Sequence, residues 1–222
     1  GLNGMEELVE GLKKAMFEDP VEDTRCVLHC EMKNEGFKTA SKVQYVARVG
    51  NFIDNGADYT GALQILKVIL SYDYLWQNIR VKGGAYGCMS GFSRTGEGYF
   101  VSYRDPNLER TMEVYEGIAD YLRNFTVSDR DMNKYIIGTM SNIDQPMTPS
   151  AKGDRSFNLY MNKVSAETIK KERLQILEAG QEDIRKLADV VEAVMKAEQV
   201  CVIGSEEKIE EAKDMFKNVT TF

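Results

Sequence analysis

The sequence predicts an α+β domain with an antiparallel sheet and helices packed mainly on one face. Strand-like runs come in pairs ahead of long helical stretches, whereas a parallel α/β fold would alternate single strands with single helices. The 222 residues are 43% hydrophobic, which is enough to bury a core without disulfides or a metal. There is neither an internal repeat nor a long linker, so residues 1–222 are expected to form one domain.

The first expected elements, within residues 1–35, are a helix and a strand. The helix ends before Pro20, and one of its faces is apolar, formed by Met5, Leu8, Val9, Leu12, Ala15 and Met16. Strands are predicted at 26–32 and 43–49, because both runs are rich in β-branched and aromatic residues. The turn-prone residues 34–36 (NEG) are expected to separate these strands.

The middle of the chain predicts two buried helical segments and a hairpin. Residues 58–70 are apolar nearly all round, as in a helix buried on most sides, and a following helix is expected to end near Arg80. Runs 86–92 and 99–103 read as strands, and the glycines of the connection 93–98 suit a hairpin loop.

The rest of the chain is predicted to be mostly helical. Asp105 and Pro106 are expected to start a helix that reaches Leu122, with the Asp as cap and the Pro in the first turn. Ser128 and Asp131 resemble a capping box. The remaining expectations are a helix to 143, a breaker-rich connection at 144–150, helices to 196 punctuated by Gly180, a strand at 200–203 and a helix at 206–216.

Composition disfavours several classes of partner. The net charge of −7 and the lack of a basic stripe argue against nucleic acid, and no apolar run reaches the roughly 20 residues that span a bilayer. The four cysteines, Cys26, Cys30, Cys88 and Cys201, show no C-x-x-C spacing, which suits a reducing compartment. An intracellular location is expected, in a bacterial cytoplasm or an organelle matrix.

No complete catalytic set is visible in the sequence. Zinc-dependent hydrolysis needs about three protein ligands, but His29 is the only histidine, and neither H-E-x-x-H nor H-x-x-E-H occurs. Serine and cysteine nucleophiles usually need a histidine base as well. We therefore expect no metal site in this chain and assign His29 no catalytic role.

The most unusual stretch is residues 75–87 (LWQNIRVKGGAYG). Gly83 and Gly84 remove side-chain bulk where an extended peptide could approach, and Arg80 and Tyr86 bracket them with donors for a peptide carbonyl. Such donors could also stabilise the charge that develops on a scissile carbonyl oxygen. The alternative is structural, with the Arg binding helix carbonyls and the Tyr packed in the sheet.

These residues carry a resemblance. Residues 75–87, followed by 102–107 (SYRDPN), closely resemble the C-terminal part of the insulinase-type (pitrilysin-like) zinc metallopeptidases, in the presequence protease branch. The resemblance is continuous from about Lys42 to Gly204. It implies a fold in which four homologous α+β domains form two halves around a chamber, and zinc bound by H-x-x-E-H and a distal Glu of the N-terminal half.

The resemblance also implies roles for this chain. It identifies Arg80 and Tyr86 as the pair that holds the substrate backbone, beside Gly83 and Gly84, at a zinc site that the missing N-terminal half supplies. The expected function is therefore the substrate-binding C-terminal part of a zinc metalloendopeptidase that degrades short unstructured peptides, inactive alone. The alternative is a non-catalytic scaffold or peptide-binding subunit with the same fold.

Two further expectations concern surfaces. For residues 102–107 a strand end and a helix cap explain most of the pattern. Arg104 could still contact neighbouring carboxylates or a domain interface. The chain begins with Gly1, so we expect it to be part of a longer polypeptide whose N-terminal catalytic half is its main partner. Self-association of the isolated chain through the surface left exposed is also expected.

Overall fold

The computed structural model describes residues 4–15 and 33–222, and it divides the chain into two compact units, Gly1–Glu31 and Met32–Phe222. The first unit contains helix α1, Met5–Ala15, as the apolar spacing predicts. The strand expected at 26–32 and the residue His29 lie outside the described residues. That residues 1–222 form one domain stays a prediction.

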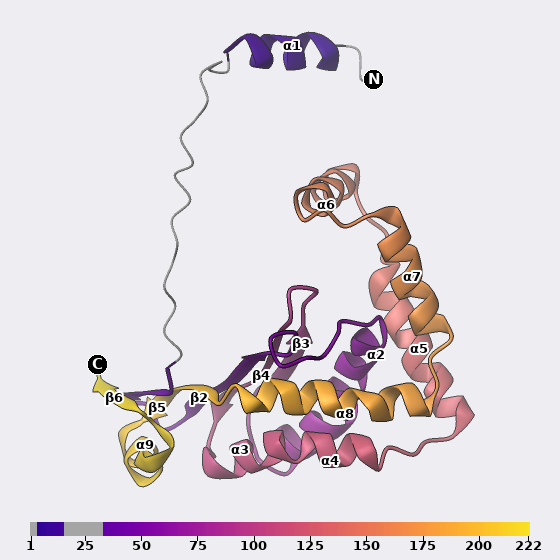
Figure 1. Ribbon diagram of the computed structural model, residues 1–222. Coiled ribbons are helices and arrows are strands. Elements are labelled where there is room, and N and C mark those ends of the chain that lie inside the picture. The colour runs from indigo at the N-terminus through magenta and orange to yellow at the C-terminus, as the bar shows by residue number, and fades with distance from the viewer. Residues whose placement is uncertain (1–3, 16–32) are drawn as a thin grey trace. The chain divides into compact units, whose positions relative to one another are not determined.

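The second unit holds a six-stranded sheet and the remaining helices (Figure 1). Its strands are β1 Glu35–Thr39, β2 Gln44–Asn51, β3 Gly87–Phe92, β4 Glu97–Asp105, β5 Gln199–Ser205 and β6 Asn218–Thr221. Its helices are α2 Ala62–Ile69, η1 Leu70–Tyr74, η2 Trp76–Val81, α3 Glu109–Glu116, α4 Ile118–Arg123, α5 Asp129–Ile143, α6 Pro149–Met161, α7 Ala166–Leu177, α8 Gln181–Lys196, α9 Glu206–Glu211 and η3 Lys213–Met215.

The sheet is mixed, with strand order β3-β4-β2-β5-β1-β6. The four strands β3, β4, β2 and β5 are antiparallel neighbours, and they include the predicted hairpin of β3 and β4. Strand β1 pairs in parallel with both β5 and β6. The α+β class is confirmed, and the antiparallel pattern covers the part of the sheet that continues into the Arg80 loop.

The helices α2, α8 and α9 cover the same face of the sheet (Figure 1). Along β2 burial alternates, and Val46 is completely buried on the covered side, while the neighbouring Tyr45 is 47% exposed on the other. Arg48, also on the covered side, donates to the Met195 carbonyl of α8 at 2.7 Å. Apolar side chains on the opposite face are exposed, and no helix described in the second unit covers them.

The core lies between the covered face of the sheet and helix α2. Helix α2 is the most buried helix of the second unit. Leu63, Leu66 and Ile69 of α2 are fully buried, as the nearly all-round apolar pattern predicts. Each such side chain contributes about 1.5–3 kcal/mol relative to an exposed one. The fully buried Tyr115 joins the core to the sheet by donating from its hydroxyl to the Val46 carbonyl at 3.3 Å.

One predicted turn was wrong. Residues 34–36 were expected to turn the chain, but Glu35 and Gly36 open strand β1. Gly36 is needed because a Cβ there would lie 2.9 Å from Ile209 and 3.2 Å from Phe216, so the missing side chain lets the C-terminal helical segment pack against the strand.

The predicted helix start at Asp105 and Pro106 was also wrong. Helix α3 begins at Glu109, and Asp105 is the buried last residue of β4. Its carboxylate accepts from the Asn107 amide at 2.9 Å and the Thr111 hydroxyl at 2.7 Å. Asp105 therefore ties the strand end to the helix that follows, without capping its first turn.

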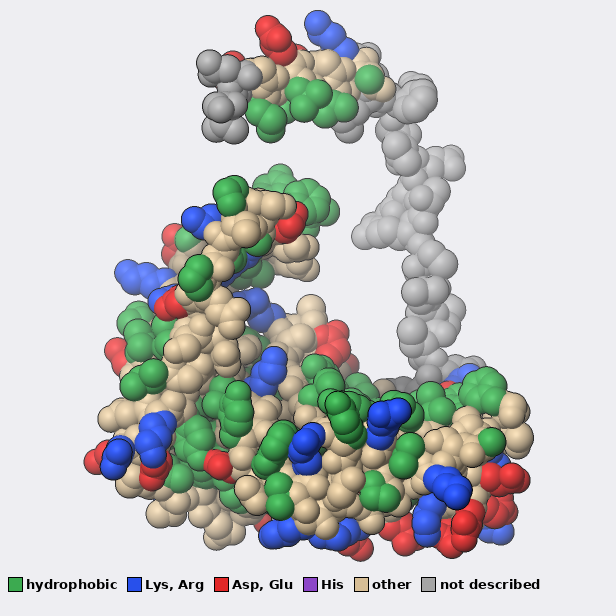
Figure 2. Space-filling view, turned by 180° about the vertical axis from the view of Figure 1, so that it is seen from behind, with side chains coloured by type: hydrophobic (Ala, Val, Ile, Leu, Met, Phe, Trp, Pro, Cys, Tyr) green, Lys and Arg blue, Asp and Glu red, His purple; other side chains and the backbone are tan. Residues whose placement is uncertain are grey.

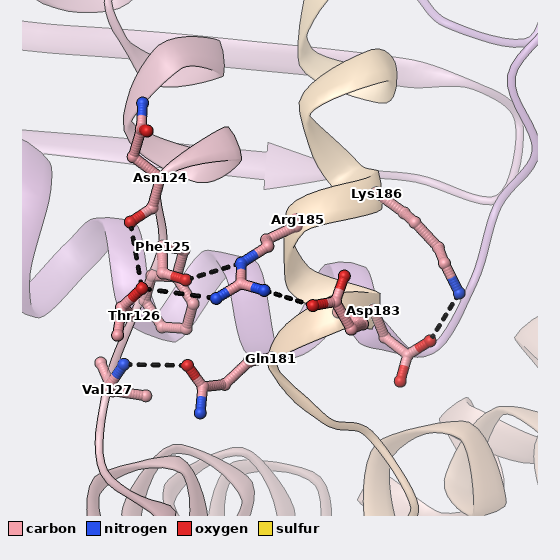
Figure 3. A network of polar contacts seen from close by, with 9 residues as sticks. Asn124, Phe125, Thr126, Val127, Gln181, Asp183, Arg185 and Lys186 are labelled. Carbon is pink, nitrogen blue, oxygen red and sulfur yellow. Dashed lines mark hydrogen bonds and ion pairs between the residues drawn. The ribbon is translucent and has the colours of Figure 1, made fainter.

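The connection between α4 and α5 is held against the start of α8 (Figure 3). Arg185 donates from Nε to the Phe125 carbonyl at 2.9 Å and from Nη2 to the Thr126 hydroxyl at 3.3 Å. The Val127 amide donates to Gln181 at 3.0 Å. Helix α5 starts as predicted, because the Ser128 hydroxyl accepts from the Asp131 amide at 3.2 Å.

Helices α5, α6 and α7 form an arm that projects from the sheet (Figure 1). Helix α6 has no buried residue, and its Phe157 and Tyr160 are 63% and 80% exposed. Figure 2 shows hydrophobic side chains on this arm as well as on the body of the unit. In residues 4–15 and 33–222 no helix is both long and apolar enough to cross a membrane.

Candidate functional site

Arg80 is carried by a π-helical extension of helix α2. The helix continues past Ile69 as η1 and η2, with hydrogen bonds five residues apart, such as Leu75 N–H to the Leu70 carbonyl. Leu75 and Ile79 are buried on one side. Wider π turns occur often at functional sites, and here they bring Trp76 and Arg80 together on the accessible side.

The guanidinium of Arg80 lies close to two aromatic rings. Its Cζ is 4.5 Å from the centre of the Trp76 ring and 5.7 Å from that of Tyr86. Nη1 also donates to the Tyr86 carbonyl across the loop. Since a guanidinium has five N–H donors, this contact leaves most of them for a further acceptor. No carboxylate pairs with Arg80 in the described part of the chain.

Tyr86 is 58% exposed and lies just before strand β3. Its ring packs against Tyr103 of β4, with the centroids 5.6 Å apart, and it has the Arg104 guanidinium 5.8 Å from its centre. In the described residues its hydroxyl has no hydrogen-bond partner. This differs from a tyrosine packed inside the sheet, which the structural alternative required.

The two glycines of the loop have separate structural reasons. A Cβ on Gly83 would lie 2.4 Å from the Ile79 carbonyl oxygen, so the loop folds directly against the end of the helix. Gly84 has φ of +79°, a left-handed conformation that glycine adopts without strain. The Gly83 carbonyl accepts from Asn107 Nδ2 at 2.6 Å, which fixes the loop to the α3 side.

The structure thus brings together all four residues singled out from the sequence, and it adds Trp76 and Arg104. Trp76 precedes Arg80 by four residues, a spacing that places side chains together on a helix and could have identified it. In the described residues Arg104 lies over the Tyr86 ring, and its expected reach to neighbouring carboxylates or a domain interface stays a prediction. Its left-handed φ of 51° has no signal in the sequence.

A second polar cluster lies under the β3–β4 loop, in a hollow of about 270 Å³. There Arg94 Nε and Nη2 bind the two carboxylate oxygens of Glu172 at 2.6 and 2.5 Å, and this partner raises the pKa of Arg94. Tyr59 lies 5.7 Å from the Arg94 guanidinium and is bonded to Gln64. Arg94, Glu172 and Tyr59 bind one another or Gln64. We therefore interpret this cluster as structural and take the Arg80 site as the candidate functional site.

The donor set of the described residues does not fit a metal. No group of three His, Cys, Asp or Glu side chains comes together there. Burial raises the pKa of the Cys88 thiol to about 11, which keeps it protonated and makes it a poor nucleophile or ligand. Neither Cys88 nor Cys201 is bonded to another cysteine.

Comparison with known proteins shows the family to which the chain is similar. Residues 34–207 match the family model described as the PreP C-terminal domain. The chain is 48% identical over 187 residues to Protein HypA of Clostridium perfringens, a match that covers 84% of the chain and 19% of HypA. It is 32% identical over 188 residues to presequence protease 1, chloroplastic/mitochondrial, of Arabidopsis thaliana, covering 84% of the chain and 17% of that protein. The chain thus spans about a fifth of these relatives.

Solved structures share the fold at low identity. A protease from Helicobacter pylori matches with a TM-score of 0.61 and 15% identity, covering 89% of this chain and 52% of that one. Pitrilysin matches with a TM-score of 0.56 and 14% identity, covering 86% of this chain and 22% of that one. A peptidase M16 inactive domain from Pseudomonas fluorescens matches with a TM-score of 0.61 and 15% identity, covering 91% and 50%.

Proposed function

Because residues 34–207 match its family model, this chain belongs to the PreP C-terminal domain family, and we propose that it is the substrate-holding part of a zinc metalloendopeptidase for short unstructured peptides. The relatives named presequence proteases support a peptidase role for the longer polypeptide. The location we propose is intracellular, a bacterial cytoplasm or an organelle matrix.

The observation that carries the proposal is the pairing of Arg80 and Tyr86. Two strong donors lie beside one glycine loop, and the Tyr86 hydroxyl has no partner in the part of the chain that the structure describes. The aromatic contacts of Arg80 with Trp76 and Tyr86 restrict its guanidinium. A restrained donor loses less entropy when it binds a peptide carbonyl, which makes the pair suitable for holding a substrate backbone.

The zinc of the proposed enzyme would be bound by the N-terminal half, because this chain has a single histidine and no H-x-x-E-H motif. When bound there, zinc supplies an activated water. The part of this chain would be to hold the substrate. Arg80 and Tyr86 would donate to the carbonyl oxygen of the scissile peptide and bind it more strongly as negative charge develops.

The test uses the intact enzyme and a fluorogenic peptide. Replacing Arg80 by Ala or Tyr86 by Phe should lower kcat by about 10²–10³, the range for one lost oxyanion donor. The melting temperature should stay close to that of the wild type, because neither side chain is buried. Tyr72→Phe is the matched control, since Tyr72 is a 69% exposed tyrosine of the same helical segment.

One outcome would reject the role of Tyr86, and another would reject only the stronger binding of the transition state. A Tyr86→Phe enzyme that is destabilised but fully active per folded molecule would make Tyr86 structural. A rise in KM at constant kcat would mean that the donors bind ground state and transition state equally.

The alternative function is a non-catalytic scaffold or peptide-binding subunit. It is kept because a solved structure with this fold is described as an inactive peptidase domain. The two functions predict different features of the longer polypeptide that contains this chain. An H-x-x-E-H motif upstream, together with peptidase activity that a chelator removes, would support the enzyme, and their absence would support the scaffold.

A further inference from the structure

Strand β4 contains a bulge next to the Arg80 loop. In its pairing with β2, Gln44 is opposite Asp105 and Val46 is opposite Ser102, so Tyr45 faces two residues of β4, Tyr103 and Arg104. Without the extra residue, Arg104 would share the covered face with the buried Ser102. The bulge turns Arg104 outward, where it is exposed, and sends Asp105 into the core. Bulges beside active sites commonly redirect a side chain in this way.

The backbone of Arg104 is unusual for its position. Among the described residues other than glycine, positive φ occurs at Arg104 (51°), Lys163 (55°) and Glu198 (49°). Lys163 and Glu198 directly follow the C-caps of α6 and α8, where a left-handed residue commonly ends a helix. Arg104 lies within a strand, at a bulge position that glycine would fill without strain. Its side chain therefore needs a separate explanation.

In the described residues, Arg104 contacts Tyr86 through both its backbone and its side chain. Its carbonyl accepts from the Tyr86 amide at 3.3 Å, and its guanidinium lies 5.8 Å from the centre of the Tyr86 ring. Tyr103, the other residue of the bulge, packs against the same ring at 5.6 Å. In the described part of the chain no carboxylate pairs with Arg104. The bulge thus holds both the backbone and the ring of Tyr86.

The same bulge fixes the other side of the loop. The inward carboxylate of Asp105 accepts from the Asn107 amide, and Asn107 donates to the Gly83 carbonyl. One irregularity in β4 therefore controls the loop at Gly83 and at Tyr86.

We propose that Arg104 is a positioning residue for Tyr86: its guanidinium restrains the phenol ring so that the hydroxyl is presented to the substrate carbonyl. This inference rests on the proposed function, since it gives Tyr86 the donor role argued above. Arg104 acts through Tyr86 and does not itself touch the reacting atoms.

The test compares three substitutions at position 104 in the intact enzyme. Arg104→Gly removes the guanidinium and relieves the left-handed backbone, so the melting temperature should be unchanged or higher while kcat falls about tenfold to hundredfold. Arg104→Ala should lower kcat equally but melt at a lower temperature than the glycine variant. Arg104→Lys keeps a cation and should recover part of kcat. Lys163→Gly is the control, a left-handed lysine remote in sequence from the loop, and should leave kcat unchanged.

A double-mutant cycle identifies the route of the effect. If Arg104 acts through the Tyr86 hydroxyl, Arg104→Gly should lower kcat further by less than twofold in a Tyr86→Phe enzyme. Full additivity would overturn the inference, as would an Arg104→Gly enzyme with wild-type kcat beside an impaired Tyr86→Phe enzyme. If Arg80→Ala and Tyr86→Phe are themselves fully active, the proposed function fails, and the inference fails with it.

Discussion

The two loop glycines occupy positions where a side chain would be costly for different reasons. Gly83 is restricted by contact, because a Cβ would lie 2.4 Å from the Ile79 carbonyl oxygen. Gly84 is restricted by conformation, because its φ is +79° and only the Pro106 side chain lies within 4 Å of its ideal Cβ, at 3.7 Å. Both restrictions arise from the loop itself and hold whether or not a substrate is present.

Substitution of Gly84 should show whether its left-handed conformation, rather than a lack of space for a Cβ, requires glycine. Gly84→Ala should reduce the free energy of unfolding by about 1–2 kcal/mol, the cost of a left-handed residue with a Cβ, and Gly84→Asn should cost less. Urea unfolding measures both. Gly153 of helix α6 is the control, since its Cβ would meet nothing within 4 Å and its φ is not positive. Gly153→Ala should stabilise by about 0.5–1 kcal/mol. A neutral Gly84→Ala variant would contradict the assigned conformation.

At this scale the sequence predicted which groups could act but not how they are held. Arg80 and Tyr86 stand out by chemistry, because a guanidinium and a phenol flank two glycines. The role of Arg104 was not predictable, because it depends on a bulge in the pairing of β2 with β4, two strands far apart in the sequence. Local patterns contain no information on such a register shift.

Helix α8 begins at a defined polar junction. The Gly180 amide donates to the Asp183 carboxylate at 3.0 Å, which is one half of a capping box, and Gln181 and Arg185 bind the α4–α5 connection (Figure 3). The backbone hydrogen bond from Gly180 lowers the pKa of Asp183, with a smaller contribution from Lys186. The start of α8 is thus stabilised by an ionised Asp183.

Removing this cap should destabilise the fold in a pH-dependent way. Asp183→Ala should cost about 1 kcal/mol at neutral pH, the usual size of a lost N-terminal cap. Since the folded pKa is below the unfolded value near ~3.9, the contribution is full above that value and is lost as pH falls through the folded pKa. The difference from wild type should therefore shrink in acid. Asp189→Ala, at an exposed site of the same helix, should change little at any pH; a pH-independent difference at position 183 would contradict the assignment.

Helices and strands were predicted correctly where the apolar periodicity extends over a long segment. They were missed where a contact with a distant part of the chain determines the structure. The hairpin and the helices α1, α2, α5 and α8 follow from apolar spacing and caps. The π-helical form of residues 70–81 was not predicted. Apolar spacing over so short a segment indicates a helix but does not distinguish α turns from π turns. Strand β1 was missed because Gly36 serves packing against Ile209, which no local window contains.

On the scale of the second unit, one face of the sheet is not covered by any helix described in that unit. Apolar side chains from four strands are exposed there: Tyr45 at 47%, Met89 at 45%, Tyr99 at 36% and Ile203 at 40%. The Arg80 loop joins β3 at this sheet, so the uncovered face and the candidate site are continuous through Tyr86 and Tyr103. The parallel strands β1 and β6 that widen the face could not be predicted, since Glu35 of β1 pairs with Asn218 of β6, 183 positions later.

Exposed apolar side chains in this number should make the 222-residue chain associate with itself when nothing covers the sheet. Tyr45 and Ile203 are directly paired on that face, so replacing both by Thr removes apolar area while retaining residues that favour strands. Sedimentation velocity over a range of concentrations should show dimers or larger species for the wild type and a shift toward monomer for the Tyr45→Thr, Ile203→Thr variant. Tyr160→Gln on helix α6, where Tyr160 is 80% exposed, is the control and should leave association unchanged. A wild-type chain that stays monomeric at every concentration would rule out this face as an association surface, and loss of association in the control would assign it to the helical arm.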